Sequence, residues 1–300
     1  MKILLFGKNG QVGWELQRSL APLGELLALD ADSQEMCGDF TDAEGLIRTV
    51  RAVAPDVIVN AAAHTAVDRA ESEPELARAI NALAPAALAQ EARRGNAWLI
   101  HYSTDYVFDG SGDLPWRETD MTAPLSVYGA TKLEGEQLIQ RAGCRHLIFR
   151  TSWVYGARGG NFAKTMLRLA QERDSLKVID DQVGAPTGAD LLADVTAHAI
   201  RAARQRPELA GLYHLVAAGE TSWHGYARFV LEFARRTGVG LKVEPEAIEA
   251  VPTSAFPTPA KRPHNSRLDT DKLRRTLGLN MPHWQYGVTR MLSEILEEQP

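Results

Sequence analysis

The chain has 300 residues, 45% hydrophobic and 24% charged, which is the composition of a folded globular protein and excludes a mainly disordered one. Its 33 Lys and Arg side chains against 38 Asp and Glu give a net charge of −5, which argues against nucleic acid as a partner. Two cysteines cannot build a disulfide framework, and no apolar run approaches the roughly 18 residues of a membrane span. We therefore expect a cytoplasmic protein of one large or two smaller domains, with no membrane partner.

Short apolar runs alternate with helical patterns through the first 150 residues, which predicts a parallel sheet covered by helices on both faces. This order corresponds to two βαβαβ units, the Rossmann-type doubly wound α/β fold, and right-handed crossovers bring the carboxyl ends of its strands to one ligand-binding edge. The predicted strands are 2–6, 25–29, 56–60, 98–102 and 146–150, and the main helices between them are 11–21, 44–53 and 73–94.

After Trp153 the alternation becomes irregular. Four prolines between residues 250 and 263 predict an ordered loop or linker without regular structure. Residues 1–152, completed by about 188–238, are expected to form the Rossmann domain. Residues 153–187 and 239–300 are expected to form a smaller C-terminal α/β substrate-binding lobe. The elements predicted in this half are helices at 161–172, 188–204, 223–236 and 284–298 and a strand at 211–216.

A glycine motif follows the first predicted strand and opens the first helix. Gly7, Gly10 and Gly13 have the spacing Gly-x-x-Gly-x-x-Gly, which lets the backbone approach a pyrophosphate at the free amides of the helix N-terminus. Asp30 ends the second strand, where a carboxylate accepts hydrogen bonds from the adenosine ribose. The motif alone is weak, and a lone Asp30 is typical of a solvated turn, but together they predict a dinucleotide site.

Tyr128 and Lys132 lie one helical turn apart, so their side chains project from the same helix face. A phenol with the usual pKa of about 10 is a poor acid at neutral pH, and a neighbouring ammonium lowers that pKa. The pair therefore suits a ketone reductase, in which the phenol donates a proton to a carbonyl. Taken alone, this spacing is more typical of a half-buried helix face with a snorkelling amine.

A cluster of polar residues follows the fourth predicted strand, at the edge where ligands bind. It contains Ser103, Thr104 and Asp105, and a hydroxyl there can share a substrate carbonyl with Tyr128. Such clusters most often cap helices or form turns. Because side chains alternate along an extended chain, only one of the two hydroxyls can face a ketone, and we expect it to be Thr104.

Together these motifs resemble the extended short-chain dehydrogenase/reductase family over essentially the whole chain. The likeness is closest to its members that reduce a nucleotide-linked keto sugar. It implies NADPH- or NADH-dependent reduction of the 4-keto group of dTDP-4-dehydro-β-L-rhamnose to dTDP-β-L-rhamnose, the last step in making this activated sugar for bacterial surface polysaccharide. The segments that carry the likeness are LLFGKNGQVG at 4–13, NAAAHTAVD at 60–68, STDYVF at 103–108, RTSWVY at 150–155 and GAPT at 184–187.

The resemblance also implies roles for individual residues. Tyr128 would donate the proton, Lys132 would hold the nicotinamide ribose and tune Tyr128, and Thr104 would hydrogen-bond the reacting oxygen. Asp105 and Trp153 would contact the sugar nucleotide, although a core position is about as common for a tryptophan. The other cofactor contacts would be Gly10, Gln11 and Val12 at the pyrophosphate, Asp30, Asp39 and Phe40 at the adenosine, and Ala63, His64, Thr65 and Tyr102 along the rest of the cofactor.

Several assignments stay open at this level. The loop cations Lys261, Arg262 and Arg267 either clamp the substrate diphosphate or form a solvated loop. Asp30 favours NADH because a carboxylate repels the 2′-phosphate of NADPH, whereas Lys8 could turn toward that phosphate, so use of both cofactors is expected. Some members of the family are magnesium-dependent homodimers, and Glu15, Asp190 and Glu294 are the acidic residues to inspect for Mg²⁺.

Three other functions compete with the reductase. A sugar-nucleotide 4,6-dehydratase follows its threonine with an Asp-Glu pair, but here Tyr106 follows Asp105, which disfavours dehydration. An epimerase of the same fold is not excluded by motif, because it runs the same hydride chemistry in both directions. A non-catalytic nucleotide-binding regulatory subunit is disfavoured by the presence of Thr104, Tyr128 and Lys132 together.

Overall fold

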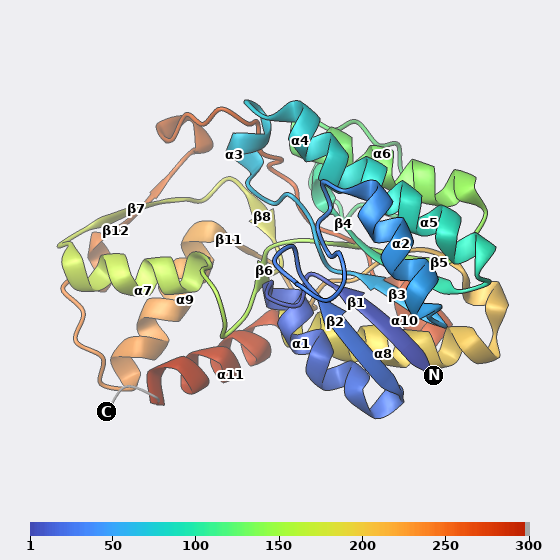
Figure 1. The fold of residues 1–300 in the computed structure, drawn as a ribbon. Coiled ribbons are helices and arrows are strands. Elements are labelled where there is room, and N and C mark those ends of the chain that lie inside the picture. The colour runs from blue at the N-terminus through green and yellow to red at the C-terminus, as the bar shows by residue number, and fades with distance from the viewer. Residues whose placement is uncertain (298–300) are drawn as a thin grey trace.

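The computed structural model describes residues 1–297, whose centre is a six-stranded sheet with parallel pairing between all neighbours. The prediction of a Rossmann-type fold is confirmed. β1 lies between β2 and β3, so the third strand in sequence pairs with the first and not with the second. From one edge to the other the strands are β2 (Glu25–Leu29), β1 (Lys2–Phe6), β3 (Val57–Asn60), β4 (Trp98–Thr104), β5 (Arg145–Thr151) and β10 (Gly211–His214) (Figure 1).

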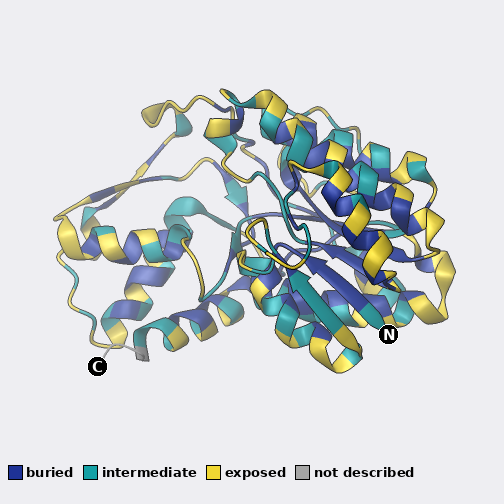
Figure 2. Cartoon of the chain, in the orientation of Figure 1, coloured by how far each residue is buried: buried dark blue, intermediate teal, exposed yellow. Residues whose placement is uncertain are grey.

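Helices cover both faces of the sheet because successive side chains of a strand point to opposite sides. In β1, Ile3 and Leu5 enter one hydrophobic core, whereas Leu4 and Phe6 enter the other. The central strands are accordingly buried along their length (Figure 2). α1 (Gln11–Leu20) and α8 (Ala189–Gln205) cover the first face, and α2 (Ala43–Val53), α5 (Ala84–Arg94) and α6 (Val127–Ala142) cover the second.

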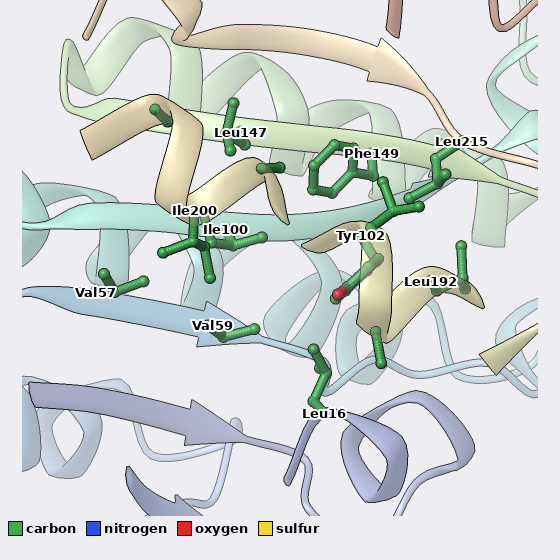
Figure 3. Packing of buried hydrophobic residues seen from close by; sticks show 14 of the residues in the cluster. Leu16, Val57, Val59, Ile100, Tyr102, Leu147, Phe149, Leu192, Ile200 and Leu215 are labelled. Carbon is green, nitrogen blue, oxygen red and sulfur yellow. The ribbon is translucent and has the colours of Figure 1, made fainter. Parts of the chain in front are cut away.

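α1 and α8 contribute aliphatic side chains at helical spacing to the core on their face of the sheet. Leu16 of α1 and Leu192 and Ile200 of α8 pack against side chains of β3, β4 and β5 (Figure 3). All three are essentially inaccessible to solvent, and each such leucine or isoleucine contributes roughly 1.5–3 kcal/mol of hydrophobic stabilisation. This packing holds the carboxyl ends of the strands in register beneath the site.

The helix predicted over 73–94 forms with an irregularity. α4 (Pro74–Arg78) passes into a π turn over Ala79–Leu83 and then into α5, where the amide of Ala84 donates to the Ala79 carbonyl five residues back. The reason is Pro85, which has no amide proton and whose ring would clash with the carbonyl four residues earlier in an α-helix. A short helix, α3 (Val67–Ala70), precedes this run.

A second, smaller core lies beside the sheet, where Figure 1 shows three helices grouped apart from the six strands. Its helices are α7 (Phe162–Glu172), α9 (Trp223–Arg236) and α11 (Trp284–Glu297), and its strands β7 (Leu176–Ile179) and β12 (Ile248–Val251) pair in parallel. The expectation of no regular structure over 250–263 is wrong in two places, because β12 continues to Val251 and a 3₁₀ turn spans Thr253–Ala255. Residue 298 of the last predicted helix lies outside the described residues.

Other boundaries differ from the sequence expectations by a few residues. β4 and β5 continue to Thr104 and Thr151, and β10 ends at His214. α8 and β10 pack with the sheet, whereas α9 packs with α7 and α11. The domain boundaries expected from the sequence stay a prediction. The remaining strands form the pairs β6 (Val154–Tyr155) with β9 (Thr187–Gly188) and β8 (Val183–Gly184) with β11 (Thr221–Ser222), and the remaining α-helix is α10 (Asp271–Leu277).

None of the helices over residues 1–297 is at once long enough and apolar enough to cross a membrane.

Candidate active site

A cleft of about 700 Å³ lies where β1, β2, β3, β4 and β5 end, the edge at which ligands of open parallel sheets bind. The structure brings most of the predicted site residues to this one cleft, but Gly13 and His64 are not among the residues that line it. The predicted residues that do line it are Gly7, Gly10, Gln11, Val12, Asp30, Asp39, Phe40, Ala63, Thr65, Tyr102, Thr104, Asp105, Tyr128, Lys132 and Trp153.

The glycine loop is built for close backbone approach. Gly7 has a φ of +85°, and a Cβ there would lie 2.7 Å from backbone atoms of Ala61 and Ala62. A Cβ on Gly13 would lie 1.8 Å from the Gly7 carbonyl oxygen, so Gly13 acts by letting the helix approach the loop. α1 begins after Gly10 without a side-chain cap, which leaves its first amides free for an anion.

Asp30 is joined to this loop by a hydrogen bond and is oriented by a second one from its own neighbour. Its Oδ2 accepts from the Asn9 amide at 2.8 Å, and its Oδ1 accepts from the Ala31 amide at 2.8 Å. The carboxylate is half-buried at the rim of the cleft, so it has oxygen lone pairs left for ribose hydroxyls. The loop and the carboxylate together therefore fit the pyrophosphate and adenosine ribose of a dinucleotide.

His64 is held by its backbone rather than aimed into the cleft. Its amide donates to Asn81 Oδ1 at 2.9 Å, and its carbonyl accepts from Asn81 Nδ2 at 3.1 Å. The ring Nε2 lies 3.7 Å from a carboxylate oxygen of Glu73. His64 thus fixes the chain between Ala63 and Thr65, which do line the cleft.

The hydroxyl of Thr104 stands at the end of β4 and is oriented by its neighbours. It accepts from the Tyr106 amide at 3.2 Å and donates to Asp105 Oδ1 at 3.1 Å. Tyr128, in the first turn of α6, packs edge to face against Tyr106 with ring centroids 5.4 Å apart. Ser126 begins that helix, and its side chain accepts from the Gly129 amide, which places Tyr128 beside the strand end.

The electrostatics of Tyr128 differ from the sequence expectation. Burial raises the pKa of its phenol to about 12, the Asp105 charge adds to the rise, and the Thr104 hydroxyl opposes it. The Lys132 ammonium donates to the Tyr102 carbonyl at 2.6 Å and is not among the groups that shift the Tyr128 pKa. The prediction that Lys132 lowers this pKa is wrong for this structure, because desolvation is the larger effect.

Asp105 is a buried carboxylate whose hydrogen bonding is incomplete. Burial raises its pKa to about 6, against partial compensation by the hydroxyls of Ser266 and Thr104. Its Oδ2 is buried and has no hydrogen-bond partner within residues 1–297. An acceptor left open in a cleft is suited to a ligand hydroxyl.

Trp153 forms part of the wall with a residue that sequence reasoning missed. Its ring stacks on that of Trp223 with centroids 3.7 Å apart and planes at 13°. Trp153 has a φ of +51°, an uncommon backbone for a bulky residue that is found preferentially at functional sites. The pairing of β8 with β11 delivers Trp223 to this position, and no local pattern announces it.

Three hydroxyls at neighbouring strand ends are also unpaired. Within the described part of the chain, the buried Oγ atoms of Ser103, Thr151 and Ser152 have no hydrogen-bond partner, and all three residues line the cleft. The sheet register places Thr104 opposite Thr151. Polar residues that follow a predicted strand mark the ligand-binding edge at the end of β4. The same pattern is present in the sequence at the end of β5.

The loop cations are already paired with carboxylates. Arg262 donates to Asp68 at 2.7 Å, and Arg267 donates to Glu220 at 2.7 Å, whereas Lys261 is exposed. The clamp on a substrate diphosphate stays a prediction. To bind the diphosphate, Arg262 would have to release Asp68, and Arg267 would have to release Glu220.

The acidic side chains within residues 1–297 of one chain do not form a magnesium site. Across residues 1–297 there is no group of three or more His, Cys, Asp or Glu side chains arranged to hold a metal ion. Glu15 pairs with Arg18, Asp190 pairs with Arg290, and Glu294 is exposed. The donors that residues 1–297 of a single chain supply therefore do not fit Mg²⁺.

A doubly wound parallel sheet with a glycine loop after β1 and a Tyr-x-x-x-Lys pair beside the end of β4 defines an extended short-chain dehydrogenase/reductase. Comparison with known proteins gives the particular family. The family model described as the RmlD substrate binding domain matches residues 1–297, and the chain belongs to this family.

Relatives of known name agree over nearly the whole chain. The dTDP-4-dehydrorhamnose reductase of Shigella flexneri is 63% identical over 295 residues, which cover 98% of each protein. A crystal structure of a dTDP-4-dehydrorhamnose reductase from Clostridium acetobutylicum superposes with a TM-score of 0.89 at 37% identity, covering 99% of this chain and 100% of that one. The enzyme from Bacillus anthracis, solved in complex with NADP, gives 0.88 at 34% identity over 98% and 99% of the two chains.

Proposed function

We propose that the protein is an oxidoreductase that reduces the 4-keto group of dTDP-4-dehydro-β-L-rhamnose to dTDP-β-L-rhamnose, with NADPH or NADH as reductant. The observation that carries the proposal is the meeting of Thr104, Tyr128 and Lys132 with the glycine loop in one cleft. The 63% identity to a dTDP-4-dehydrorhamnose reductase supports this choice of substrate. The reaction would complete the supply of an activated deoxysugar for bacterial surface polysaccharide.

The chain supplies the proton and orders the carbonyl. The Tyr128 phenol donates its proton to the ketone oxygen, for which it must come within hydrogen-bond reach of that oxygen. Its raised pKa keeps the phenol protonated until negative charge develops on the oxygen in the transition state. Thr104 Oγ1, already oriented by Tyr106 and Asp105, hydrogen-bonds the same oxygen.

Substrate contacts follow from the groups left open in the cleft. Asp105 Oδ2 accepts a sugar hydroxyl, which compensates a carboxylate oxygen that is otherwise buried without a partner. Trp153, stacked on Trp223, presents a broad aromatic surface for a sugar face or a base. Together these contacts orient the ketone toward Tyr128.

The cofactor would lie along the strand ends. Gly7, Gly10, Gln11 and Val12 hold its pyrophosphate, and Asp30, Asp39 and Phe40 hold its adenosine. Lys132 holds the nicotinamide ribose, with Ala63, Thr65 and Tyr102 along the wall, and His64 fixes the chain between Ala63 and Thr65 from behind. When bound, the reduced nicotinamide supplies the hydride. Support comes from the fit of the glycine loop to a pyrophosphate and from the NADP complex of the similar Bacillus anthracis enzyme.

We also propose a cytoplasmic homodimer that acts on a small sugar nucleotide and binds no nucleic acid. Both cysteines are free, which suits a reducing compartment. The side chains of Trp14 and Tyr286 are 45% and 72% exposed, and a second copy of the chain could cover such apolar surface.

The test is turnover with purified dTDP-4-dehydro-β-L-rhamnose under NADPH and, separately, under NADH. We expect consumption of the reduced nicotinamide in step with one equivalent of dTDP-rhamnose, identified by mass spectrometry and NMR. An epimerase would rearrange the sugar without net consumption of reductant, and a regulatory subunit would bind both ligands without product. Either result would overturn the proposal.

A further inference from the structure

A buried polar network connects the base of the cleft to the middle of the sheet. It contains Asn60 at the end of β3, His101 in β4 and Lys132 in α6, whose side chains are essentially inaccessible to solvent. Asn60 Nδ2 lies 3.0 Å from His101 Nδ1, and His101 Nε2 lies 3.4 Å from Lys132 Nζ. The roles proposed above use Lys132 but neither Asn60 nor His101.

The backbone determines which way the Asn60 amide points. Asn60 Oδ1 accepts from the Ala62 amide at 3.0 Å. A flipped side chain would place its NH₂ group against that N–H, which leaves two donors facing each other. Nδ2 is therefore the atom that faces the imidazole, and because it can only donate, His101 Nδ1 must accept.

The tautomer of His101 follows from this hydrogen bond. A neutral imidazole carries one N–H, so with Nδ1 as acceptor the proton lies on Nε2. Burial and the charge of Lys132 lower the pKa of His101 well below 6.5, so the ring is neutral around pH 7. Its Nε2–H is thus the group presented to Lys132 Nζ.

An N–H beside Nζ favours one protonation state of Lys132. An ammonium has three donors and no acceptor, whereas a neutral amine has a lone pair that can accept from Nε2–H. Nζ retains a donor role in either state, through its 2.6 Å hydrogen bond to the Tyr102 carbonyl. The imidazole therefore stabilises the neutral amine relative to the ammonium.

The other charged groups near Lys132 do not reverse this preference for the neutral amine. Glu136, one turn further along α6, favours the ammonium, but Arg150 of β5 already binds both of its carboxylate oxygens, at 2.9 and 2.7 Å. Tyr128 lies on the same helix face and is neutral. Burial outweighs Glu136 and lowers the pKa of Lys132 to about 8.

We propose that His101, held in its Nε2–H tautomer by Asn60, is a positioning residue that presents this N–H to Lys132 and biases the lysine toward its neutral form. The inference rests on the proposed function, in which Lys132 holds the nicotinamide ribose. Lys132 then exchanges its proton in the neutral to weakly alkaline range instead of remaining charged throughout it. As the pH rises, Lys132 loses its proton and the turnover rate falls. Asn60 and His101 determine the pH at which this alkaline limb of the rate profile begins.

The first test observes the tautomer directly and needs neither substrate nor cofactor. Imidazole ¹⁵N chemical shifts of the folded protein, with the His101 signal assigned by its absence in His101→Gln, distinguish Nε2–H from Nδ1–H. We expect Nε2–H in the natural chain. Asn60→Asp should convert it to Nδ1–H, because a carboxylate oxygen facing Nδ1 can only accept. An Nδ1–H tautomer in the natural chain would overturn the inference.

The second test measures kcat and KM against pH with the proposed substrate and NADPH. In Asn60→Asp, Nε2 becomes an acceptor for the ammonium, so the alkaline limb should move up by at least about one pH unit. His101→Gln, whose amide oxygen can turn toward Nζ, should move it the same way and serves if Asn60→Asp does not fold. Ile100→Val, a core substitution on the adjacent strand position, should leave the limb in place.

The two tests separate this inference from the proposed function. A natural chain that consumes no NADPH with the keto sugar contradicts the proposed function, while the ¹⁵N shifts still decide the tautomer. A natural chain that turns over normally, with an alkaline limb unmoved in both Asn60→Asp and His101→Gln, overturns the role of His101 alone.

Discussion

Replacement of Asp105 by asparagine should change how the stability of the protein depends on pH. The side chain is 1% exposed, and burial raises its pKa from 3.8 to about 6. An acid with a folded-state pKa above its unfolded value destabilises the fold wherever it is ionised. This loss of folding free energy is small below about pH 4, grows as the pH rises, and reaches its full value above about pH 6. The separation of the two pKa values corresponds to a full value of about 3 kcal/mol.

Asp105→Asn removes this cost because the amide is neutral throughout. The amide nitrogen would take the place of an oxygen without a hydrogen-bond partner, and that penalty, about 1–3 kcal/mol, does not change with pH. The informative quantity is therefore the difference in unfolding free energy between variant and natural chain at two pH values. We expect it to move by about 2.5 kcal/mol in favour of the variant between about pH 4 and about pH 7, because part of the roughly 3 kcal/mol is already present at pH 4.

Urea unfolding followed by circular dichroism measures this difference. Asp109→Asn is the matched control, because a hydrogen bond from the Ser111 amide lowers the Asp109 pKa. That carboxylate stabilises the fold where it is ionised, so its replacement should lose stability as the pH rises, the opposite sign. A difference for Asp105→Asn that is the same at both pH values would refute the assignment of Asp105 as a buried, destabilised carboxylate.

Three further predictions concern the proposed reaction. Tyr128→Phe keeps the ring and removes the proton donor, so turnover should fall at least ~100-fold with cofactor affinity little changed; near-normal turnover would exclude Tyr128 as the acid. Thr104→Val should damage kcat strongly and Ser103→Ala only mildly, and the reverse order would move the catalytic hydroxyl to Ser103. Asp30→Ala should shift the ratio of the two kcat/KM values toward NADPH, because the carboxylate repels a 2′-phosphate; an unchanged ratio would show that Asp30 is not the ribose ligand.

Local sequence patterns were sufficient to predict the strands and helices that position the site. The strands over residues 2–6 and 25–29 and the helix over 223–236 have the predicted bounds, because hydrophobic period and flanking glycine or serine are properties of a short window. The same holds for Thr104 and Asp30, which the alternation of elements assigns to strand ends. Parallel strands then bring such ends to one edge whatever the details of packing.

The partners of individual side chains required the folded chain. Trp223 reaches Trp153, and Arg262 reaches Asp68 across 194 positions, and no periodicity in a short window specifies contacts between such distant residues. The π turn before Pro85 was likewise invisible in a pattern that matched one long helix.

The sequence by itself determined the fold class, the family and most of the residues that line the cleft, because these depend on local periodicity and on motifs of fixed spacing. Only the tertiary structure decided the protonation equilibria within that cleft. Tyr128 and Lys132 were expected to form a pair that lowers the phenol pKa, yet burial raises it and Lys132 turns to the Tyr102 carbonyl. A pKa depends on solvent exclusion and on charges from every neighbouring element, and those are set when the strands and helices pack together.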